Sequence, residues 1–485
     1  MREYLTKKEL TRLGPESIQK LQNQRLAATV RHLAPHTPFY ANFFKEHNID
    51  PWTIKGAEDW KRLNIPLIRK VDYMKHPKEF IVSPQASDAF SVYRKYHAQY
   101  DAFMNISLAF KALFGRQELK KQVEQFFFPK MPAFSGGTEY GQPVPVFLTG
   151  AEKQQLHNMI DMIADYLQHL LPPERPRVGM NLFPYGPHLA WHAAHAALDS
   201  AVDLNLSTAA GGAIPTERLV ALADAFKPTV FTGMAEYFRH RFLPLCQQKK
   251  AKLPPFALFV HGATMLLDTE RALLQVEAAK AGIQELTVLN LFGASEIKTA
   301  LLPECSPGTG FHHLNPLAAI IKTTHIESPT AYEFTPDAGN LVIWNISGAG
   351  TLLLGYVLGD HTTEVKTGPC AGCGLNVQRF FGITRAKDVQ TQLSLTGIVE
   401  EKIKGARVNL IEIRSRVLTA GAQECQITVS KDRRKLTVAY AGRAGADKKI
   451  KQALESVEVH PVLKRVALQT FLKQPGFKFK PIILQ

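Results

Sequence analysis

The sequence predicts an α/β protein: a large N-terminal domain of mixed β-sheets covered by helices, followed by a small α+β domain. Two observations support this prediction. Between about residues 130 and 395, short apolar runs such as PTVFTG (228–233) alternate with helical stretches such as TERLVALADAF (216–226), which is typical of sheets covered by helices. Beyond that region the pattern changes to that of a compact α+β module. We therefore expect residues 1–395 to form the large domain and residues 396–485 the small one.

The composition is that of a globular protein with more than one domain. At 485 residues the chain exceeds what one hydrophobic core usually supports, and 45% hydrophobic with 21% charged residues excludes wholesale disorder. The first residues, MREYLTKKELTRLG, are charged and lack the apolar stretch of a secretory signal. Five cysteines are too few for a disulfide scaffold and suit a reducing compartment, so we expect a cytoplasmic protein.

The individual elements follow from the same patterns. Residues 1–80 predict amphipathic helices that break at APHTPFY and DPW. Buried strands are expected at 176–183, 228–233, 256–262 and 287–293, and helices at 216–226 and 268–282. In the tail we expect helices over 404–418 and 446–457, a hairpin from 424–430 and 435–442, and a strand over 465–471.

One segment, NLVIWNISGAGTLLLGYVLG (340–359), runs for 20 residues without a charge. That length and composition suggest a membrane span. The Asn, Ser and Gly residues in its middle instead favour two buried strands joined by a turn, and we expect no membrane span.

The net charge of +15 is concentrated in the tail. From residue 397 to the end there are 18 Lys or Arg against 8 Asp or Glu, so this part carries about +10. A basic module predicts an anionic partner such as a phosphate-rich small molecule or an acidic protein. No nucleic-acid-binding motif accompanies the charge, so we expect no nucleic acid; a merely soluble basic surface is the alternative.

The stretch FSGGTEYGQPVPVFLT (134–149) places a glycine-rich turn before a strand-like run. Successive backbone N–H groups in such a turn bind anionic oxygens, and Ser and Thr hydroxyls add donors. It is not a Walker A loop, because the Lys-Ser/Thr ending is absent. Taken alone, a turn of this kind is more often only a turn.

Two carboxylates follow apolar strands in a way that complements this loop. Glu296 comes after a small-residue turn in LNLFGASEI, and Asp360 ends LLLGYVLGD. A glycine-rich phosphate loop, one carboxylate for Mg²⁺ and another for ribose hydroxyls together make a site suited to ATP. Each carboxylate alone would more often be a solvated turn residue.

This set of motifs resembles the adenylate-forming (acyl-CoA synthetase-like) superfamily, and specifically its phenylacetate–CoA ligase branch. SGGTEYGQP is similar to that family's phosphate loop with one extra residue, FGASE to its Tyr-Gly-x-Ser/Thr-Glu motif, and YVLGD to its Tyr-Arg-x-Gly-Asp ribose motif. APHTPFYANFFKEHNID resembles the entry segment of the branch, and GARVNLIEI the start of the family's mobile C-terminal domain. The resemblance covers nearly the whole chain, in patches.

The resemblance implies an adenylate-forming enzyme fold and an acid–CoA ligase. In that chemistry a carboxylate attacks the α-phosphate of ATP, and the acyl-adenylate then passes its acyl group to the thiol of coenzyme A. The loop would hold the phosphates, Glu296 would bind Mg²⁺, and Asp360 the ribose. A C-terminal lysine would stabilise the charge developing at the α-phosphate; Lys478 is favoured and Lys480 is the alternative.

The remaining site residues implied by the resemblance fall into two groups. The catalytic set is completed by Thr138. Contacts to the nucleotide are expected from Ser135, Gly136, Gly137, Gly141, Gly262, Ala263, Phe292, Gly293, Ser295 and Arg379.

Some positions depart from the family. Gln142 stands where many members have Lys, and Thr264 where the family usually has Glu. The hinge pattern is poorly represented over residues 379–404. These departures from the family pattern concern the residues of the thioester step more than those of adenylation. His188, His192 and His195 share a helical face without a carboxylate, so buried structural histidines are expected ahead of pocket lining or a metal site.

A structural zinc site is expected from four further residues. GPCAGCG supplies Cys370 and Cys373 as a Cys-x₂-Cys pair, whose thiolates converge on one ion. PECSPGTGFHH supplies Cys305 and His312, at positions similar to zinc-binding segments in several members of the branch; His313 is the alternative nitrogen ligand. Two unrelated turns with free thiols would be the other interpretation.

Three functions remain open at this stage. The first is a ligase that joins a small carboxylic acid to coenzyme A. The second passes the acyl group to an acidic carrier protein or an amine, and the basic tail suits either anionic acceptor. The third is a degenerate relative that binds nucleotide without turnover. Aromatic and aliphatic acids are both open, as is the oligomeric state, for which a dimer is one expectation.

Overall fold

The computed structural model describes residues 4–484 except for 102–105, 109, 112–114, 135–144, 172, 264–265, 386–399, 404–405, 443–444, 458 and 473–481. The chain divides into two compact units. Unit 1 comprises Met1–Leu170, Gly186–Ala201 and Asn290–Ile383, and unit 2 comprises Leu171–Tyr185, Val202–Leu289 and Thr384–Gln485. Within the described ranges, no helix has the length and apolar character needed to span a membrane.

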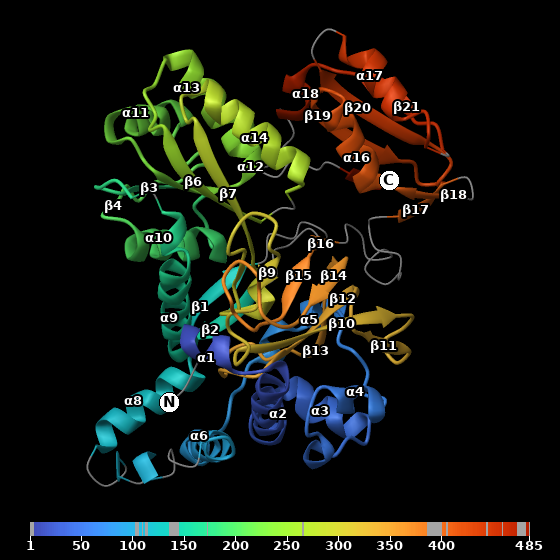
Figure 1. Cartoon of the computed structure of the whole chain (residues 1–485). Helices are drawn as coiled ribbons and strands as arrows, with labels where there is room; N and C mark the ends of the chain where they lie inside the picture. The colour runs from blue at the N-terminus through green and yellow to red at the C-terminus, as the bar shows by residue number, and fades with distance from the viewer. Residues whose placement is uncertain are drawn as a thin grey trace. The chain divides into compact units, whose positions relative to one another are not determined.

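The N-terminal part of unit 1 is helical, as predicted. Its helices are α1 (Lys7–Arg12), α2 (Pro15–His32), α3 (Pro38–Glu46), α4 (Glu58–Arg62), α5 (Lys70–Lys75), α6 (Ala89–Ala98) and α8 (Arg116–Phe127), most of them blue in Figure 1. The predicted breaks are single 3-10 turns, Ala34–His36 and Pro51–Thr53. Proline is the first residue of α2 and α3, where its missing N–H costs no hydrogen bond.

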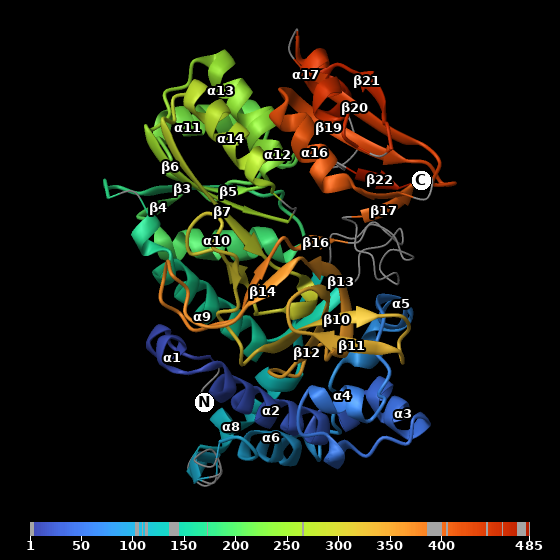
Figure 2. The same ribbon diagram turned by 45° about the vertical axis from the view of Figure 1, so that its right-hand side comes forward.

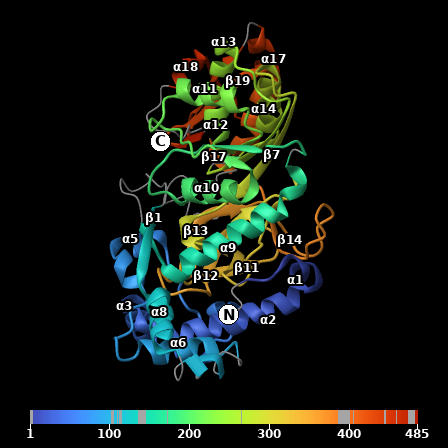
Figure 3. The same ribbon diagram turned by 90° about the vertical axis from the view of Figure 1, so that its left-hand side faces the viewer.

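The sheets of unit 1 follow. Strands β1 (Pro129–Phe134) and β2 (Pro145–Thr149) pair antiparallel and lead into α9 (Gly150–Tyr166), which Figure 3 shows running beside the larger sheet. That sheet has the order β11-β10-β12-β13 within the unit, from Tyr332–Thr335, Ala319–Ile326, Gly339–Asn345 and Leu354–Thr362. A small sheet joins β14 (Glu364–Lys366), β15 (Arg379–Phe381) and β9 (Phe311–His312).

The uncharged segment 340–359 forms most of β12 and β13. The two strands are antiparallel neighbours, with Val342 opposite Val357 and Ile343 opposite Tyr356. Trp344 and the apolar side chains of both strands are buried. The prediction of two buried strands joined by a turn is therefore confirmed.

Unit 2 contains a largely parallel sheet. Its order is β4 (Leu204–Asn205), β3 (Val178–Leu182), β5 (Val230–Gly233), β6 (Phe256–Gly262) and β7 (Glu285–Phe292), whose last residues enter unit 1. Helices α11 (Thr216–Phe226), α13 (Leu243–Lys249) and α14 (Asp268–Lys280) share one core with these strands. Phe231, Phe238 and Phe259 are fully buried there, so the predicted alternation of strands and helices is confirmed.

The C-terminal part of unit 2 is an α+β module (Figure 2). Its elements are β17 (Glu400–Ile403), β18 (Ala406–Asn409), α16 (Leu410–Thr419), β19 (Ala422–Val429), β20 (Leu436–Gly442), α17 (Ala446–Ala453), β21 (Val462–Arg465), α18 (Leu468–Leu472) and β22 (Ile482–Leu484). The sheet order is β21-β20-β19-β22, and the predicted hairpin is β19–β20. The domain boundary at 395/396 falls outside the described residues and stays a prediction.

The prediction of a strand over 465–471 is wrong. Only Arg465 of that stretch belongs to β21, and Leu468 begins α18. The reason is that β21 lies at the sheet edge and pairs only from Val462 to Arg465 with β20. Val466 N still donates to Tyr440 O at 2.9 Å, but among the described residues no strand pairs with the chain beyond Arg465, and α18 begins at Leu468.

A buried charge network holds the centre of unit 2. The Glu424 carboxylate contacts Arg414 Nη2 at 2.8 Å and His240 Nε2 at 2.8 Å, and Arg414 also pairs with Glu270. Burial alone would raise the pKa of Glu424, but the charge of Arg414 and the hydrogen bond with His240 outweigh it and hold that pKa well below the usual range. The network therefore contributes to stability only while Glu424 is ionised.

Glu424→Gln should destabilise the protein at neutral pH by about 3–5 kcal/mol, because Arg414 loses a buried counter-charge. Since the folded-state pKa of Glu424 is depressed, its contribution is complete above about pH 4–5, the range of an unfolded glutamate, and is lost as the pH falls. Urea unfolding at pH 7 and in acid would measure both effects. Glu412→Gln, which breaks the half-exposed Arg416–Glu412 pair, should cost under about 1 kcal/mol. Equal losses in the two variants would contradict this account.

Candidate functional site

Part of the predicted nucleotide site lies outside the described residues. This holds for Ser135, Gly136, Gly137, Thr138, Gly141 and Gln142 of the loop, for Thr264, for the hinge segment 386–399, and for Lys478 and Lys480. The loop follows β1 and precedes β2, so its two ends are fixed by an antiparallel pair in which Phe134 lies opposite Pro145. The roles of these residues stay predictions.

Glu296 is a buried carboxylate immediately after a strand. β7 ends at Phe292, and the 3-10 turn Ser295–Ile297 follows it. Glu296 is 1% exposed, and neither of its carboxylate oxygens has a hydrogen-bond partner among the described residues. Burying an unpaired carboxylate is costly unless a cation accompanies it. The donor type and its vacant oxygens therefore fit a Mg²⁺ ligand.

Asn345 ties this turn to the sheet that carries Asp360. Its side-chain Nδ2 donates to the backbone oxygen of Glu296 at 3.1 Å, and its Oδ1 accepts from Leu353 N at 3.0 Å. Leu353 directly precedes β13, in which Asp360 is buried. One side chain thus links the backbone of the two predicted carboxylate segments.

The other predicted nucleotide contacts occupy strand ends and a turn. In unit 1, Phe292 ends β7, Gly293 follows it, buried Ser295 begins the turn, and Arg379 begins β15. The Nε of Arg379 is buried without a hydrogen-bond partner among the described residues. In unit 2, Gly262 ends β6, and Ala263 has a φ of 76°. A left-handed conformation is uncommon for alanine, and such conformations cluster at functional sites.

The four predicted zinc ligands lie together in unit 1. One ligand atom from each of Cys305, His312, Cys370 and Cys373 lies within 4.8 Å of the others. Cys305 Sγ is 3.8 Å from Cys370 Sγ, and Cys373 Sγ is 3.6 Å from His312 Nε2. Ligands at about 2.0–2.3 Å from one tetrahedral ion lie roughly 3.3–3.8 Å apart, so these separations suit a single metal ion.

Neighbouring groups orient these ligands. His312 Nδ1 is 2.9 Å from Gly310 O, which fixes the ring and leaves Nε2 toward the thiols. The Tyr166 hydroxyl donates to Cys373 Sγ at 3.2 Å. A hydrogen bond with the Cys373 thiol lowers the pKa of Cys305 and raises that of Cys373, because the two sulfurs share a proton.

His313, the alternative nitrogen ligand, lies outside this cluster. Its Nε2 is 2.9 Å from Ala319 O, and burial lowers its pKa to about 4. It is thus a neutral histidine packed in the interior. His313 follows β9, which ends at His312, and its backbone N–H donates to Gln378 O at 2.9 Å.

The helical histidines are half-buried, whereas buried ones were expected. They lie on or just before α10 (Leu189–Ala201). His188 Nδ1 is 2.9 Å from Phe134 O, and the His195 ring stacks on Trp191 with centroids 5.0 Å apart. The expectation that no carboxylate accompanies these histidines is wrong, because His195 Nε2 lies 3.5 Å from Asp199 Oδ2, one turn along α10. Within the described ranges, the Cys/His cluster is the only group of three or more His, Cys, Asp or Glu side chains that could hold a metal ion.

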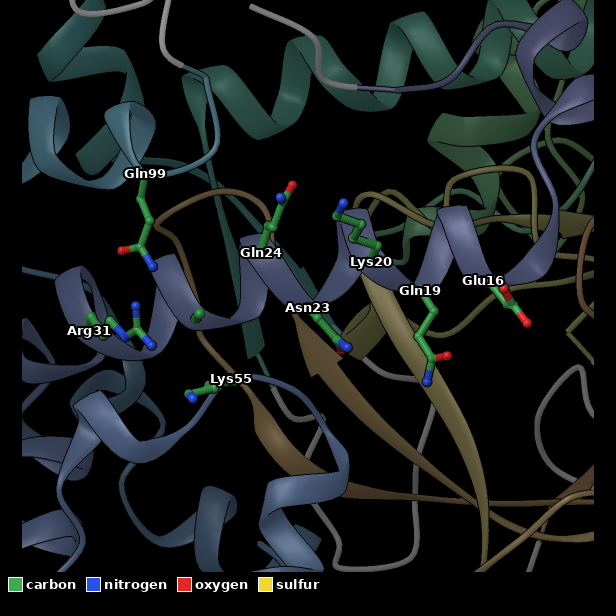
Figure 4. A pocket seen from close by; sticks show the side chains of 9 residues that line it. Glu16, Gln19, Lys20, Asn23, Gln24, Arg31, Lys55 and Gln99 are labelled. Atoms are coloured by element: carbon green, nitrogen blue, oxygen red, sulfur yellow. The ribbon is translucent and has the colours of Figure 1, made fainter.

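A groove of about 530 Å³ runs along α2 (Figure 4). Lys20, Arg31 and Lys55 line it together with Glu16 and several side-chain amides. Arg31 is engaged with the backbone oxygens of Trp52 and Ile54. None of the predicted site residues lines this groove, so it takes no part in the candidate site.

The sequence reasoning missed Glu152, Lys298 and Asn345, which support the Glu296 turn. Lys298 Nζ and Glu152 Oε1 form a buried ion pair at 2.5 Å. A signal for Glu152 was present: TGAE (149–152) has the Ser/Thr-x-x-Glu spacing of a helix capping box, and Thr149 and Glu152 form one. Nothing in the local pattern identified the partner Lys298.

The sequence matches no family model and no curated protein. The structure is similar to solved structures of 2-hydroxyisobutyryl-CoA ligase. In the postadenylation state with R3-HIB-AMP the identity is 14%, over 99% of this chain and 92% of that one, with a TM-score of 0.72. For the same state with 2-HIB-AMP the identity is 15%, over 100% of this chain and 91% of that one, with a TM-score of 0.70. For the thioesterification state with 2-HIB-AMP and CoA the identity is 14%, over 99% of this chain and 92% of that one, with a TM-score of 0.58.

At this identity the similarity establishes the fold. Membership of the superfamily, the branch within it and the role of each site residue stay predictions. The chain has the fold of the adenylate-forming acyl-CoA ligases, as its sequence predicted.

Proposed function

We propose that this protein is an ATP-dependent ligase that activates a carboxylic acid as an acyl-adenylate and transfers the acyl group to coenzyme A. The observation that carries the proposal is the buried Glu296 carboxylate, which has no partner among the described residues. It lies in the turn that follows β7, in a fold shared with a ligase whose structure contains an acyl-AMP. A buried carboxylate without a protein partner is a group that can hold the Mg²⁺ that ATP chemistry uses.

The proposed reaction has two steps. A carboxylate oxygen of the acid attacks the α-phosphorus of ATP, the bond to the bridging oxygen breaks, and pyrophosphate leaves. The thiolate of coenzyme A then attacks the acyl carbonyl carbon, and AMP leaves. Mg²⁺, when bound, would offset the phosphate charge.

The residues of this chain would divide these tasks. The loop with Ser135, Gly136, Gly137, Thr138 and Gly141 would donate hydrogen bonds to the phosphates. Glu296 would hold the cation, Asp360 would accept from the ribose hydroxyls, and Lys478 would stabilise charge at the α-phosphate. Gly262, Ala263, Phe292, Gly293, Ser295 and Arg379 would complete the nucleotide contacts.

The phenylacetate–CoA ligase branch and the acceptor belong to the proposal. The basic tail supports an anionic acceptor, which is coenzyme A in the leading proposal and an acidic carrier protein in the alternative. The departures at Gln142 and Thr264 support a third candidate, a nucleotide-binding relative without turnover. All five cysteines are free, which supports a reducing, cytoplasmic location.

We further propose that the Cys/His cluster binds a structural zinc ion. Three thiols and one imidazole are ligands that zinc prefers, and four protein ligands leave no open position for catalysis. The ion would join the segment after β7 to the segment before β15. Its role would therefore be structural, holding two loops of unit 1 together.

ATP–pyrophosphate exchange with a panel of aromatic and aliphatic acids tests adenylation without coenzyme A. We expect exchange with at least one acid. Glu296→Gln should reduce it on the order of 100-fold or more, because a metal-binding charge is lost, while the fold is kept. Glu333→Gln, an exposed carboxylate on β11, is the control and should retain activity. If the protein binds ATP but exchanges pyrophosphate with none of the acids, the result favours a nucleotide-binding relative without turnover. Near-normal exchange in Glu296→Gln would exclude the proposed role of Glu296.

Lys478→Ala should slow adenylate formation far more than it slows thioester formation from preformed adenylate. The reason is that its positive charge would act only on the α-phosphate step. Single-turnover assays of the two half-reactions measure this. Lys480→Ala is the matched variant and should affect both steps little. The reverse pattern would assign the role to Lys480, and no selective defect in either would remove the C-terminal lysine from catalysis.

Protein purified without a histidine tag should contain about one equivalent of zinc by elemental analysis. Cys370→Ser should lower that content and the thermal stability together, because metal binding is coupled to folding. Cys246→Ser, which changes a buried free cysteine of unit 2, should leave the zinc content unchanged. Less than a tenth of an equivalent in the wild type, unaffected by Cys370→Ser, is the result that rejects zinc.

A further inference from the structure

We propose that the buried ion pair between Lys298 and Glu152 is a positioning device for the candidate metal–nucleotide site. It would fix the Glu296 turn against the strand that leaves the candidate phosphate loop. The two residues act through Glu296 and are positioning residues rather than catalytic ones. The proposal rests on the proposed function in one respect only, namely that Glu296 holds a divalent cation beside ATP.

The Glu152 carboxylate joins three separate segments. Its Oε1 accepts from Lys298 Nζ at 2.5 Å, two residues beyond Glu296. Its Oε2 accepts from the backbone N–H of Thr149, the last residue of β2, at 2.8 Å. The same oxygen accepts from Gly350 N, in the β12–β13 connection, at 3.2 Å. Both oxygens are therefore committed to holding other parts of the chain.

The surroundings are shaped around this carboxylate. The side chains of Lys298 and Glu152 are 4% and 1% exposed. A Cβ atom at Gly348 would come within 2.2 Å of Glu152 Oε1, and one at Gly350 within 2.4 Å of Oε2. Gly348 also has a φ of 84°. The β12–β13 connection can thus approach the carboxylate only as bare backbone.

Lys298 holds the turn in an uncommon conformation. Its φ of 50° and ψ of −95° lie outside the regions that lysine normally occupies. Its N–H donates to Ser295 O at 3.1 Å, which closes the turn around Glu296. Such a conformation persists only where surrounding contacts impose it, and the ion pair at the end of this side chain is such a contact.

The consequence for Glu296 follows from its own contacts. Its carboxylate has no hydrogen-bond partner among the described residues, so its position depends on the backbone of the turn and on the packing around the buried side chain. Two side chains anchor this backbone: Asn345, which binds Glu296 O, and Lys298. A buried ion pair adds little net stability over apolar groups, but it imposes one geometry. We therefore assign the pair to geometry rather than to stability.

The test measures Mn²⁺ binding in the presence of ATP by electron paramagnetic resonance, together with thermal unfolding. Lys298→Met should weaken Mn²⁺ binding about tenfold, the scale seen when groups that orient metal ligands are removed. It should also lower the unfolding temperature, because Glu152 is left buried and unpaired. In the exchange assay the metal concentration for half-maximal rate should rise, while the KM of the acid should not.

The double variant Glu152→Gln/Lys298→Met separates position from stability. Removing both charges should restore the unfolding temperature, because no unpaired charge remains, whereas Mn²⁺ binding should stay weak. Lys322→Met is the matched control, since it breaks the more exposed Lys322–Glu58 pair of unit 1 and should change neither quantity.

Wild-type Mn²⁺ affinity in the double variant would overturn the proposal, and so would a wild-type protein that binds no Mn²⁺ with ATP. Failure of the proposed function is a different result. If the wild type binds Mn²⁺ with ATP but exchanges pyrophosphate with no acid, adenylation fails. The affinities of the variants still decide the positioning role in that case.

Discussion

The candidate site of unit 1 depends on one shared acceptor, the buried carboxylate of Glu152. It caps α9, receives the N–H of Gly350 and pairs with Lys298, so three segments distant in sequence meet at two oxygens. Because each donor would otherwise be buried without a partner, displacing any one of them is costly. The start of α9, the end of β2, the turn after β7 and the β12–β13 connection are thereby joined through one side chain.

A contrast between satisfied and unsatisfied buried groups separates structure from function. Glu152 and Glu424 are buried carboxylates with cationic partners, and each joins segments of its own unit. Glu296 is equally buried, yet its oxygens have no partner among the described residues. Native proteins rarely leave such groups unmet without a reason. The Cys/His cluster is a different case: Tyr166 and Gly310 contact two of its members, and one ligand atom from each of the four residues lies within 4.8 Å of the others.

The sequence was informative where the physical signal is local. Apolar periodicity predicted the strands of unit 2 and the hairpin β19–β20, and the Cys-x₂-Cys spacing pointed to Cys370 and Cys373. It failed where the outcome depends on distant partners. Lys298 and Glu152 are 146 residues apart, so no local pattern joins them. The stretch 465–471 has strand-like residues but meets no partner strand beyond Arg465.

In unit 1, the Lys298–Glu152 ion pair and the Cys/His cluster act on different residues of the candidate site. The Lys298–Glu152 pair controls the turn of Glu296. The Cys/His cluster instead bears on Arg379, because His312 and Arg379 are partners in the β9–β15 ladder and Cys373 lies six residues before Arg379. A metal ion on these ligands would fix the segment that leads into β15, and with it the start of the strand that carries Arg379. Structural elements outside the reacting centre thus set the geometry of both a candidate cation ligand and a candidate nucleotide contact, and each does so through its own segment of the chain.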